Sequence, residues 1–570
     1  MSRSDLYDHL DAVWAGLTAP GQPFEINTLP IRGNPTRVFA EGPATLRDVW
    51  LASTPFAERD YLVYEDERWS YARAHAEVAS LCQWLIDQGV APGDRVALAL
   101  RNYPEWLLGY WATLCAGATV VGMNAWWVGP EMVYAIEDAQ PKVLIGDAER
   151  LTRLAEQSAE IGALKVVAVR CEADVFPGAV DFAETISAPA ELPAIDIDPE
   201  SDACIFYTSG TTGRPKGAQQ THRGCVNNIM NLAFAAAMNA GVAERMGQPI
   251  PDPESLPIPA ALVTTPLFHV TANNCVAHPM TLNGGKLVCM YRWDAGQALE
   301  LVEREKITAL TGVPVMAREI ISHPDFDKYD TSTLASMGGG GAQLQPDLVG
   351  KIDESVKTAR PQTGYGMTET CGIITSIAGD FFIDKPESCG RAMPNFEAKV
   401  VDDEGNELQQ GAVGELWVRG GSVIKGYLNR EDATAETITD GWLHTGDVAR
   451  IDERGFIFIV DRKKDMVLRG GENVYCAEVE SALFDHSEVT ECTVFGVPDD
   501  RLGEEVGAAV VLKDGARLSA EDLRAHCAGQ IAKHKVPRYI WVLDQPLPRN
   551  ASGKFLKREL RENLKVADAA

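Results

Sequence analysis

The sequence predicts an α/β fold in which a large N-terminal domain of layered sheets and helices is followed by a small α+β domain. The first supporting observation is that short apolar runs alternate with helical stretches, a pattern typical of layered architecture with substantial parallel sheet. The apolar runs are RVALAL, KVLIG, KVVAV, CIFYT and GKLVCM. The first half shows no self-similarity at a period of about 20–50 residues, so it does not indicate a repeat protein.

The second observation is that the pattern of expected secondary structure changes twice along the chain. From about residue 396 turns and alternating strands dominate, and DDEGN (402–406) is a hairpin signal. After Asp461 a compact unit of about 110 residues runs to the end. We therefore place an N-terminal domain at 1–461, with a β-rich subdomain at about 396–461, and a C-terminal domain at 462–570. Because a length of 570 residues favours about four domains, the N-terminal domain should contain several subdomains.

Two uncharged stretches need an interpretation because a membrane span also lacks charge. Residues 106–130 are interrupted by glycines and end in the run ATVVGMN, which predicts a buried helix followed by a strand. Residues 224–243 contain several asparagines. Their apolar positions Ile229, Leu232, Ala233 and Ala236 have helical spacing, which predicts an amphipathic helix. No transmembrane segment is predicted.

Charge excludes two classes of general function. The chain holds 52 Lys plus Arg against 81 Asp plus Glu, a formal charge of −29. This balance argues against general binding to nucleic acid or to an anionic membrane. An anionic ligand must instead meet a local group of cations or backbone N–H groups. Residues 530–565 provide such a group, with nine Lys or Arg against three acids.

The twelve cysteines are scattered and form no CxxC pair, so they predict reduced thiols of a cytoplasmic protein rather than a zinc site. The N-terminal residues have no apolar signal core and are not rich in Arg and Ser. Monomer and homodimer are both compatible with the sequence.

The strongest motif is YTSGTTGRPKG (207–217), which follows the apolar run CIFY. Glycines allow the backbone to approach an anion, hydroxyl groups donate hydrogen bonds, and Lys216 adds a positive charge. Together they predict a phosphate-binding loop. Neither the Walker pattern GxxxxGK[ST] nor the dinucleotide pattern GxGxxG fits the segment.

This motif resembles the phosphate-binding signature of the adenylate-forming superfamily, and the chain is most similar to its AMP-forming acyl-CoA synthetases. The resemblance continues in order over roughly residues 50–560. It implies that ATP, Mg²⁺ and coenzyme A are bound. The loop residues implied to hold nucleotide phosphates are Thr208, Ser209, Gly210, Thr211, Thr212 and Lys216, and Thr208 is also implied as a metal ligand.

Two segments resemble the acyl pocket of the family. PLFHV (266–270) lacks the carboxylate with which amino-acid-activating members bind the substrate ammonium, so a peptide-synthetase role is disfavoured. GGGGA (338–342) resembles the glycine turn that forms a wall of the pocket. The implied pocket residues are His269, Thr271, Asn273, Asn274, Cys275, Gly339, Gly340 and Gly341. In some long-chain enzymes of the family a Trp at the position corresponding to 273 gates the acyl tunnel. This chain has Asn273 there, which does not favour such a gate.

GYGMTE (364–369) resembles the adenine and metal segment of the family. Tyr365 offers a flat face for adenine, and Glu369 supplies the hard oxygen ligand that Mg²⁺ prefers. The residues implied in nucleotide binding here are Thr363, Gly364, Tyr365, Gly366, Thr368 and Glu369.

The remaining motifs lie around the domain boundary. TGD (445–447) and the DR pair (461–462) resemble the grip on the ribose, with Asp447 and Arg462 in that role. DRKKD (461–465) resembles the hinge of a mobile C-terminal domain, with Lys464 at the hinge position. Gly470 and Gly471 match a strand that lines the pantetheine tunnel of coenzyme A.

NASGKF (550–555) resembles the loop that carries the catalytic lysine. Lys554 would bridge the substrate carboxylate and the α-phosphate during in-line attack. Together with Lys216, Thr208 and Glu369 it completes the implied catalytic set.

The resemblance implies an ATP-dependent acyl-CoA synthetase that converts a carboxylic acid to acyl-AMP and pyrophosphate, and then to acyl-CoA and AMP. We favour a medium- or long-chain fatty acid or an aryl-alkanoic acid. Alternatives are an aryl-CoA ligase of coumarate or benzoate type, an acyl-AMP ligase that loads a carrier protein, a luciferase-like oxygenase and a nucleotide-binding pseudoenzyme. Lys216, Glu369 and Lys554 are all present, which does not favour the pseudoenzyme.

Overall fold

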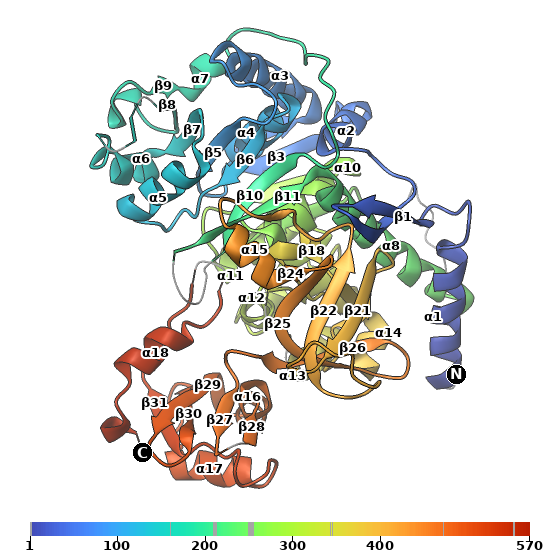
Figure 1. The fold of residues 1–570 in the computed structure, drawn as a ribbon, viewed down its shortest axis with the longest axis vertical. Coiled ribbons are helices and arrows are strands. Elements are labelled where there is room, and N and C mark those ends of the chain that lie inside the picture. The colour runs from blue at the N-terminus through green and yellow to red at the C-terminus, as the bar shows by residue number, and fades with distance from the viewer. Residues whose placement is uncertain are drawn as a thin grey trace.

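Two large sheets and the helices between them form the body of the protein. The computed structural model describes residues 3–159, 161–162, 164–208, 214–248, 256–341, 344, 346–470, 472–550 and 553–569. Within these residues the strands form sheets of eight, fourteen and five strands and two separate hairpins. Figure 1 shows the layered body and, at one end, the smaller C-terminal domain. The predicted α/β fold with a large N-terminal and a small C-terminal domain is therefore confirmed.

The eight-stranded sheet contains the strand that leads into the predicted phosphate loop. Its order is β23 (Gly426–Tyr427), β11 (Lys216–Thr221), β10 (Asp202–Thr208), β6 (Thr119–Gly122), β5 (Arg95–Ala99), β7 (Val143–Asp147), β8 (Lys165–Val169) and β9 (Val180–Asp181). From β10 to β9 neighbouring strands are parallel, while β11 and β23 are antiparallel. The carboxyl ends of the parallel strands therefore meet at one edge, where ligands of such sheets bind.

The uncharged stretch at 106–130 is a core element, as predicted. It forms most of α4 (Pro104–Cys115), in which every residue is buried, and then β6. Trp106, Trp111 and Leu114 of α4 belong to one apolar cluster with α3 (Tyr71–Asp87) and the sheet. No helix of the described residues is long and apolar enough to cross a bilayer.

The fourteen-stranded sheet is parallel in its middle and antiparallel at one end. Its order is β21 (Phe396–Val401), β22 (Gly414–Gly420), β25 (Trp442–Ile451), β26 (Phe456–Arg462), β20 (Gly390–Ala392), β19 (Thr375–Ala378), β16 (Arg360–Thr363), β15 (Ser336–Gly339), β14 (Ala309–Gly312), β12 (Ala260–Val263), β13 (Lys286–Cys289), β3 (Asp60–Tyr64) and β4 (Glu67–Ser70), with β24 (Ile438–Thr439) beside β25. Strands β3 and β12–β16 are parallel. Strands β21, β22, β25 and β26 form the antiparallel end, and DDEGN lies between β21 and β22.

Helices cover the sheets and connect their strands. Besides α3 and α4, the helices of the N-terminal domain are α1 (Arg3–Leu17), α2 (Leu46–Ala52), α5 (Gly129–Ala139), α6 (Ala148–Ala155), α7 (Phe182–Thr185), α8 (His222–Arg245), α9 (Val270–Ala272), α10 (His278–Leu282), α11 (Ala295–Glu305), α12 (Pro314–Ile321), α13 (Pro346–Ser355), α14 (Gly379–Asp384) and α15 (Glu431–Thr437). A π-helical turn at Asn273–Ala277 joins α9 to α10.

The helix predicted at 224–243 exists as α8, but the predicted buried face is wrong. Ala233 and Ala236 are exposed, whereas Asn227, Asn228 and Asn231 are buried. The asparagines face inward because two of them bond to main chain and side chains of other segments: Asn227 accepts a hydrogen bond from Phe39 N, and Asn228 accepts one from Ile373 N. Hydrogen bonding thus overrides the apolar pattern at these positions.

The C-terminal domain contains the five-stranded sheet, with β28 (Glu472–Val474), β27 (Val467–Arg469), β30 (Gly503–Leu512), β29 (Val489–Asp499) and β31 (Tyr539–Leu543). Helices α16 (Cys476–Phe484) and α17 (Ala520–Ala528) pack against this sheet in an apolar core of their own. Figure 1 shows α18 (Lys557–Asn563) on the side that faces the N-terminal domain.

The predicted group of cations at 530–565 is largely paired within the C-terminal domain. Lys535, Arg538, Arg549, Lys557 and Arg558 all form ion pairs with Asp or Glu. Residues 462–570 as a whole hold 17 Lys plus Arg and 18 Asp plus Glu. The C-terminal domain is therefore close to neutral, and the surplus acids lie in the N-terminal domain.

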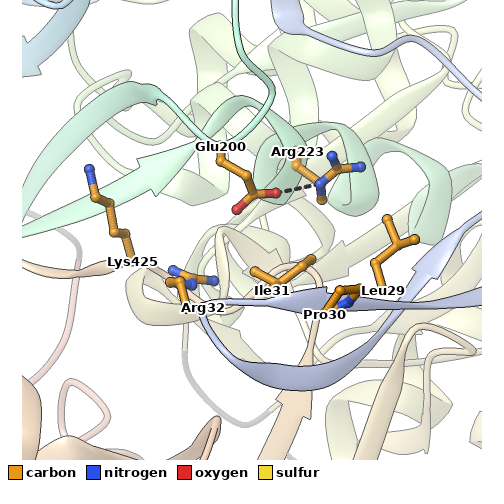
Figure 2. Close-up of a pocket in the computed structure, with 7 residues that line it drawn as sticks. All are labelled: Leu29, Pro30, Ile31, Arg32, Glu200, Arg223 and Lys425. Carbon is orange, nitrogen blue, oxygen red and sulfur yellow. Dashed lines mark hydrogen bonds and ion pairs between the residues drawn. The ribbon is translucent and has the colours of Figure 1, made fainter.

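The hairpin of β1 (Ile26–Ile31) and β2 (Asn34–Phe39) borders a cavity of about 340 Å³ (Figure 2). Its charged lining consists of Arg32, Arg223, Lys425 and Glu200. Figure 2 shows Glu200 among the three cations, and it pairs with Arg223 at 2.5 Å. No residue predicted to bind nucleotide or acid lines this cavity.

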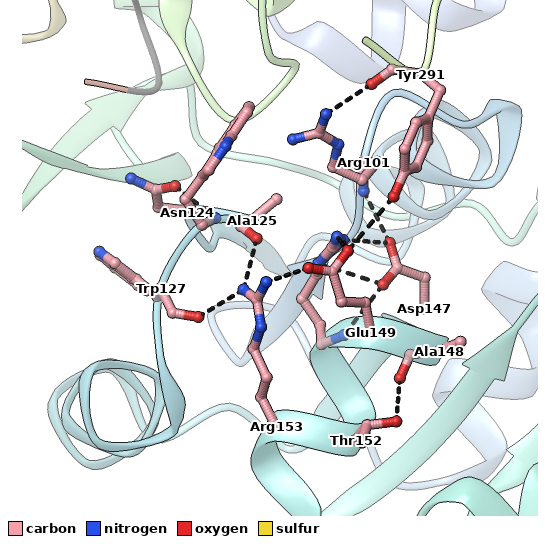
Figure 3. A network of polar contacts seen from close by, with 12 residues as sticks. Arg101, Asn124, Ala125, Trp127, Asp147, Ala148, Glu149, Thr152, Arg153 and Tyr291 are labelled. Carbon is pink, nitrogen blue, oxygen red and sulfur yellow. Dashed lines mark hydrogen bonds and ion pairs between the residues drawn. The ribbon is translucent and has the colours of Figure 1, made fainter. Parts of the chain in front are cut away.

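A polar network occupies the ligand-binding edge of the eight-stranded sheet (Figure 3). Arg150 is almost fully buried and pairs with Asp147 at 3.3 Å and with Glu149 at 2.6 Å. Burial raises the pKa of Asp147, while Arg150 and backbone N–H groups oppose this change. Arg101 lies between the rings of Trp126 and Tyr291, at 4.2 and 4.7 Å.

We expect the Arg150→Ala substitution to lower the free energy of unfolding by about 3–5 kcal/mol, because it leaves the buried Asp147 carboxylate without its cation. Urea unfolding followed by tryptophan fluorescence measures this change. Arg558→Ala is the matched control. It breaks an exposed pair with Glu562 and should change the free energy of unfolding much less than Arg150→Ala does. Equal effects of the two substitutions would contradict the assigned role of Arg150.

Candidate active site

The phosphate-loop segment begins at the ligand-binding edge of the eight-stranded sheet. Thr208 ends β10 and is paired in register with Lys216, which begins β11. The Thr208 hydroxyl lies 3.5 Å from the Lys216 carbonyl oxygen. The Lys216 ammonium lies 5.0 Å from the centre of the Tyr427 ring. Ser209, Gly210, Thr211 and Thr212 lie outside the described residues.

The predicted adenine and metal segment forms a tight hairpin of β17 (Gly366–Met367) and β18 (Gly372–Ile373), with Glu369 in its turn. A side chain at Gly366 would overlap the carbonyl oxygen of Gly372, which explains the glycine. The Glu369 carboxylate is buried and accepts a hydrogen bond from the Tyr427 hydroxyl through Oε1 at 2.8 Å. No described residue donates a hydrogen bond to Oε2, which leaves this oxygen available.

The hairpin is held from behind by buried side-chain amides. Asn274 donates to Gln220 Oε1 at 2.7 Å and to the Cys371 carbonyl oxygen at 2.9 Å. Gln220 donates to the Thr368 carbonyl oxygen at 3.4 Å, and Asn228 accepts from Ile373 N at 2.9 Å. The buried amides therefore fix the main chain on both sides of Glu369.

The predicted ribose residues meet the predicted adenine residue. Asp447 and Arg462 are paired in register across β25 and β26, and Arg462 Nε lies 3.1 Å from Asp447 Oδ1. The Tyr365 hydroxyl donates to Asp447 Oδ2 at 2.5 Å. Burial beside Asp447 raises the pKa of Tyr365 well above its ordinary value. Asp461, next to Arg462, instead accepts hydrogen bonds from the backbone N–H groups of Arg462 and Cys476.

The strands of the fourteen-stranded sheet bring the glycine turn to the same place. Gly339 and Thr363 end the parallel strands β15 and β16 in register, and the Thr363 hydroxyl donates to the Gly339 carbonyl oxygen at 2.9 Å. Next to them lie Gly340 and Gly364. A Cβ at Gly340 would have only the Gly364 carbonyl oxygen within 4.0 Å, so space is open on this side.

Lys554 reaches this space from the C-terminal domain. A Cβ at Gly341 would lie 4.0 Å from Lys554 Cε, and one at Gly553 would lie 3.0 Å from Val313 Cγ2 at the start of α12. The Lys554 side chain is exposed in the structure. Partial removal of the ammonium from water by the neighbouring groups lowers the pKa of Lys554 to about 8, and the positive charge of Arg462 contributes. The charges of Asp447 and Glu369 also act on Lys554, so the predicted residues form one group.

The residues predicted for the acyl pocket fall into two sets. His269 lies beside Phe268, and its Nε2 is buried without a described partner. Burial lowers the pKa of His269 to about 4, and Lys554 contributes to this shift. Thr271 and Cys275 are partly buried, and the Cys275 sulfur lies 3.9 Å from Asn228 Nδ2.

The side chains of Asn273 and Asn274 are fully buried and bond within the protein. Asn273 contacts His278 Nε2 at 3.2 Å and donates to Asn274 Oδ1 at 2.9 Å. Their predicted place in the wall of the acid pocket remains a prediction.

Two protein-family models match the chain. The AMP-binding enzyme family matches residues 49–428, and the AMP-binding enzyme C-terminal domain matches residues 478–554. The chain belongs to the AMP-binding enzyme family. The predicted resemblance to acyl-CoA synthetases is confirmed, and the protein is an AMP-binding enzyme of the acyl-CoA ligase type.

Individual AMP-binding enzymes show how far the similarity extends. A feruloyl-CoA synthase from Amycolatopsis sp is 37% identical over 496 residues, which cover 86% of this chain and 93% of the relative. A mitochondrial medium-chain acyl-CoA ligase from Bos taurus is 32% identical and covers 91% and 86% of the two chains. The crystal structure of ATP-bound MatB from Rhodopseudomonas palustris has a TM-score of 0.79 at 29% identity, with 91% and 99% covered.

The segment between the domains of this AMP-binding enzyme is a short exposed turn. Lys464 lies in the turn between β26 and β27, and its neighbour Lys463 pairs with Asp403 at 2.9 Å and Glu415 at 3.3 Å. Gly470 follows the next strand, β27, and donates from its N–H to the Leu502 carbonyl oxygen at 2.8 Å. Gly471 lies outside the described residues.

Sequence reasoning missed Tyr427 and Gln220. No motif singles out either residue: Gln220 lies past the end of the phosphate-loop motif, and Tyr427 is 58 residues from Glu369 in sequence. Only the pairing of β11 with β23 brings Tyr427 to the site.

The lowered pKa of Lys554 predicts that the rate of adenylation depends on pH. The protonated amine is the form that attracts phosphate, and the pKa of Lys554 lies at about 8, below the ordinary lysine value of 10.5. Activity should therefore be present below pH 8 and fall as pH rises through 8. We expect kcat/KM for adenylation to fall about tenfold per pH unit above pH 8, measured by pyrophosphate exchange. Lys554→Arg should lose this descending limb if it retains activity; an unchanged limb would assign it to another group.

Proposed function

We propose that the protein is an ATP-dependent acyl-CoA synthetase that forms an acyl adenylate and then an acyl-CoA. The observation that carries this proposal is the convergence of Lys554, Asp447, Arg462 and Glu369 beside open glycine main chain, although these residues come from two domains. The family match and the ATP-bound structural relative support it.

In the first half-reaction, a carboxylate oxygen of the acid attacks the α-phosphorus of ATP, and the bond to pyrophosphate breaks. The acid and the triphosphate repel each other, so positive charge must hold them together. Lys554 would contact the acid carboxylate and the α-phosphate, while Lys216 would contact the outer phosphates. Asp447 and Arg462 would hold the ribose, and Tyr365 would lie against the adenine.

The residues at Glu369 fit Mg²⁺. Oε2 is a hard oxygen donor without a described partner, and Thr208 offers a hydroxyl at the end of β10. Mg²⁺ commonly uses one or two carboxylates together with substrate phosphates. When bound, it would neutralise phosphate charge, while Glu369 and Thr208 would fix its position.

In the second half-reaction, the thiol of coenzyme A loses its proton and attacks the acyl carbonyl carbon, and AMP leaves. The turn at Lys464 is the proposed hinge, since it is exposed and joins the domains. Rotation there would withdraw Lys554 and bring the strand with Gly470 towards the acyl group. Gly471 is proposed to share this role.

The named relatives differ in the acid that they activate. One relative is named a feruloyl-CoA synthase and another a medium-chain acyl-CoA ligase, so the names of the relatives do not single out one acid. We retain medium- or long-chain and aryl-alkanoic acids as the proposed class. A cytoplasmic location remains a prediction from the twelve free cysteines, and neither a monomer nor a homodimer is favoured.

We expect a panel of aryl and aliphatic acids, supplied with ATP, Mg²⁺ and coenzyme A, to contain at least one acid that yields pyrophosphate, AMP and a thioester in equal amounts. Pyrophosphate, AMP and thioester are measured separately, with a reaction lacking coenzyme A as the control. Acyl-AMP without any thioester would reject the CoA ligase and favour transfer to a carrier protein.

The Lys554→Ala substitution should affect the two half-reactions to different extents. This substitution should lower the adenylation rate at least about 100-fold, because it removes the charge that offsets repulsion in the transition state. Thioester formation from supplied acyl-AMP should change less than about threefold. Lys533→Ala, at an exposed position of the same domain, should leave both halves unchanged. Equal losses in both halves for Lys554→Ala would contradict the proposed role.

A further inference from the structure

Tyr427 lies between the two oppositely charged residues of the proposed phosphate and metal site. Its hydroxyl donates to Glu369 Oε1 at 2.8 Å, and the Lys216 ammonium lies 5.0 Å from the centre of its ring. The side chain is buried, as is that of Glu369. One aromatic residue therefore contacts both the carboxylate and the cation.

The position of Tyr427 is fixed by main-chain pairing. Tyr427 lies opposite Ala218 in the pairing of β23 with β11, two residues along the strand from Lys216. Its backbone N–H donates to the Thr434 hydroxyl at 2.9 Å. Three residues earlier, Ile424 N donates to the Glu369 carbonyl oxygen at 3.0 Å. The segment 424–427 thus holds Glu369 by its main chain and by its side chain.

Neither Lys216 nor Glu369 forms an ion pair with a described residue, although they share a neighbour. Opposite charges at such a site would gain by pairing directly, since screening is weak where water is excluded. A direct pair would occupy the groups that phosphate and metal need. The Tyr427 hydroxyl uses one carboxylate oxygen, and the ring attracts the ammonium through its face.

We propose that Tyr427 is a positioning residue that keeps Glu369 and Lys216 apart and oriented for a divalent cation and for phosphate. This inference rests on the proposed function in one respect, the assignment of Glu369 as metal ligand. It adds a residue without direct contact to the reacting atoms. The ring and the hydroxyl have separable roles, the first toward Lys216 and the second toward Glu369.

Two substitutions separate these roles. Tyr427→Phe keeps the ring and removes the hydroxyl, whereas Tyr427→Leu removes both. The probes are Mn²⁺, measured by electron paramagnetic resonance in the presence of a non-hydrolysable ATP analogue, and the same analogue without metal in EDTA. Neither measurement requires turnover or knowledge of the acid, so a failure of the proposed acyl-CoA activity would leave the test valid.

We expect Tyr427→Phe to weaken Mn²⁺ binding at least about tenfold, because a hydrogen bond to a charged group is lost. Metal-free binding of the analogue should change less than about twofold. Tyr427→Leu should weaken both, because Lys216 also loses its contact. In activity assays, Tyr427→Phe should raise the Mg²⁺ concentration needed for half-maximal adenylation more than it lowers kcat at saturating Mg²⁺.

The matched control is Tyr7→Phe, which removes another tyrosine–carboxylate hydrogen bond, to Asp384 at 2.6 Å, far from the site in the fold. It should leave both binding constants unchanged. A double substitution with Glu369→Gln tests the coupling: Tyr427→Phe should have no further effect on Mn²⁺ binding in that background.

Two results would overturn the inference. One is unchanged Mn²⁺ binding in Tyr427→Phe. The other is that Tyr427→Phe weakens Mn²⁺ binding and metal-free binding of the analogue equally, which a merely structural role would produce. If Tyr427→Phe does not fold, Thr434→Val displaces Tyr427 through its backbone N–H without emptying the core. It should weaken Mn²⁺ binding about threefold and spare the metal-free analogue, and the absence of that difference would likewise reject the proposal.

Discussion

The hydrogen bonds from buried side-chain amides to the 366–373 hairpin are the constraint on which the site depends. Gln220, Asn228 and Asn274 come from β11, α8 and the π-helical turn, and together they bond to three main-chain groups around Glu369. Each amide would be costly to bury without a partner, at about 1–3 kcal/mol. The same bonds therefore stabilise the packing of three segments and fix the hairpin that presents Tyr365 and Glu369.

Charge is arranged on the same principle of local pairing. The C-terminal domain is nearly neutral, because it holds 17 Lys plus Arg and 18 Asp plus Glu. Several of the cations near its end form ion pairs with these acids. Lys554 differs in having no described ion pair, and among the described residues Arg462 pairs with Asp447 alone. A large net negative charge is thus compatible with a polyanionic ligand, since the few cations in the cleft decide the local field.

The layered α/β fold can be predicted from the sequence, since apolar runs and glycine turns are local signals. The helix and strand predicted within 106–130 correspond to α4 and β6. The buried face of α8 was predicted wrongly, because Asn227 and Asn228 are buried for hydrogen bonds that come from segments far away in sequence. Tyr427 could not be predicted for the same reason, as only the register of β23 against β11 brings it to Glu369.

The contact of the two domains brings Lys554 of the smaller domain to the residues predicted for the nucleotide site. Lys554 enters an open space beside Gly341, and its loop touches the N-terminal domain at Val313. The surrounding protein lowers the pKa of Lys554, so the charged amine is least stable in this position when no anion is bound. An anionic ligand beside Lys554 would offset that cost, because a nearby negative charge favours the protonated amine.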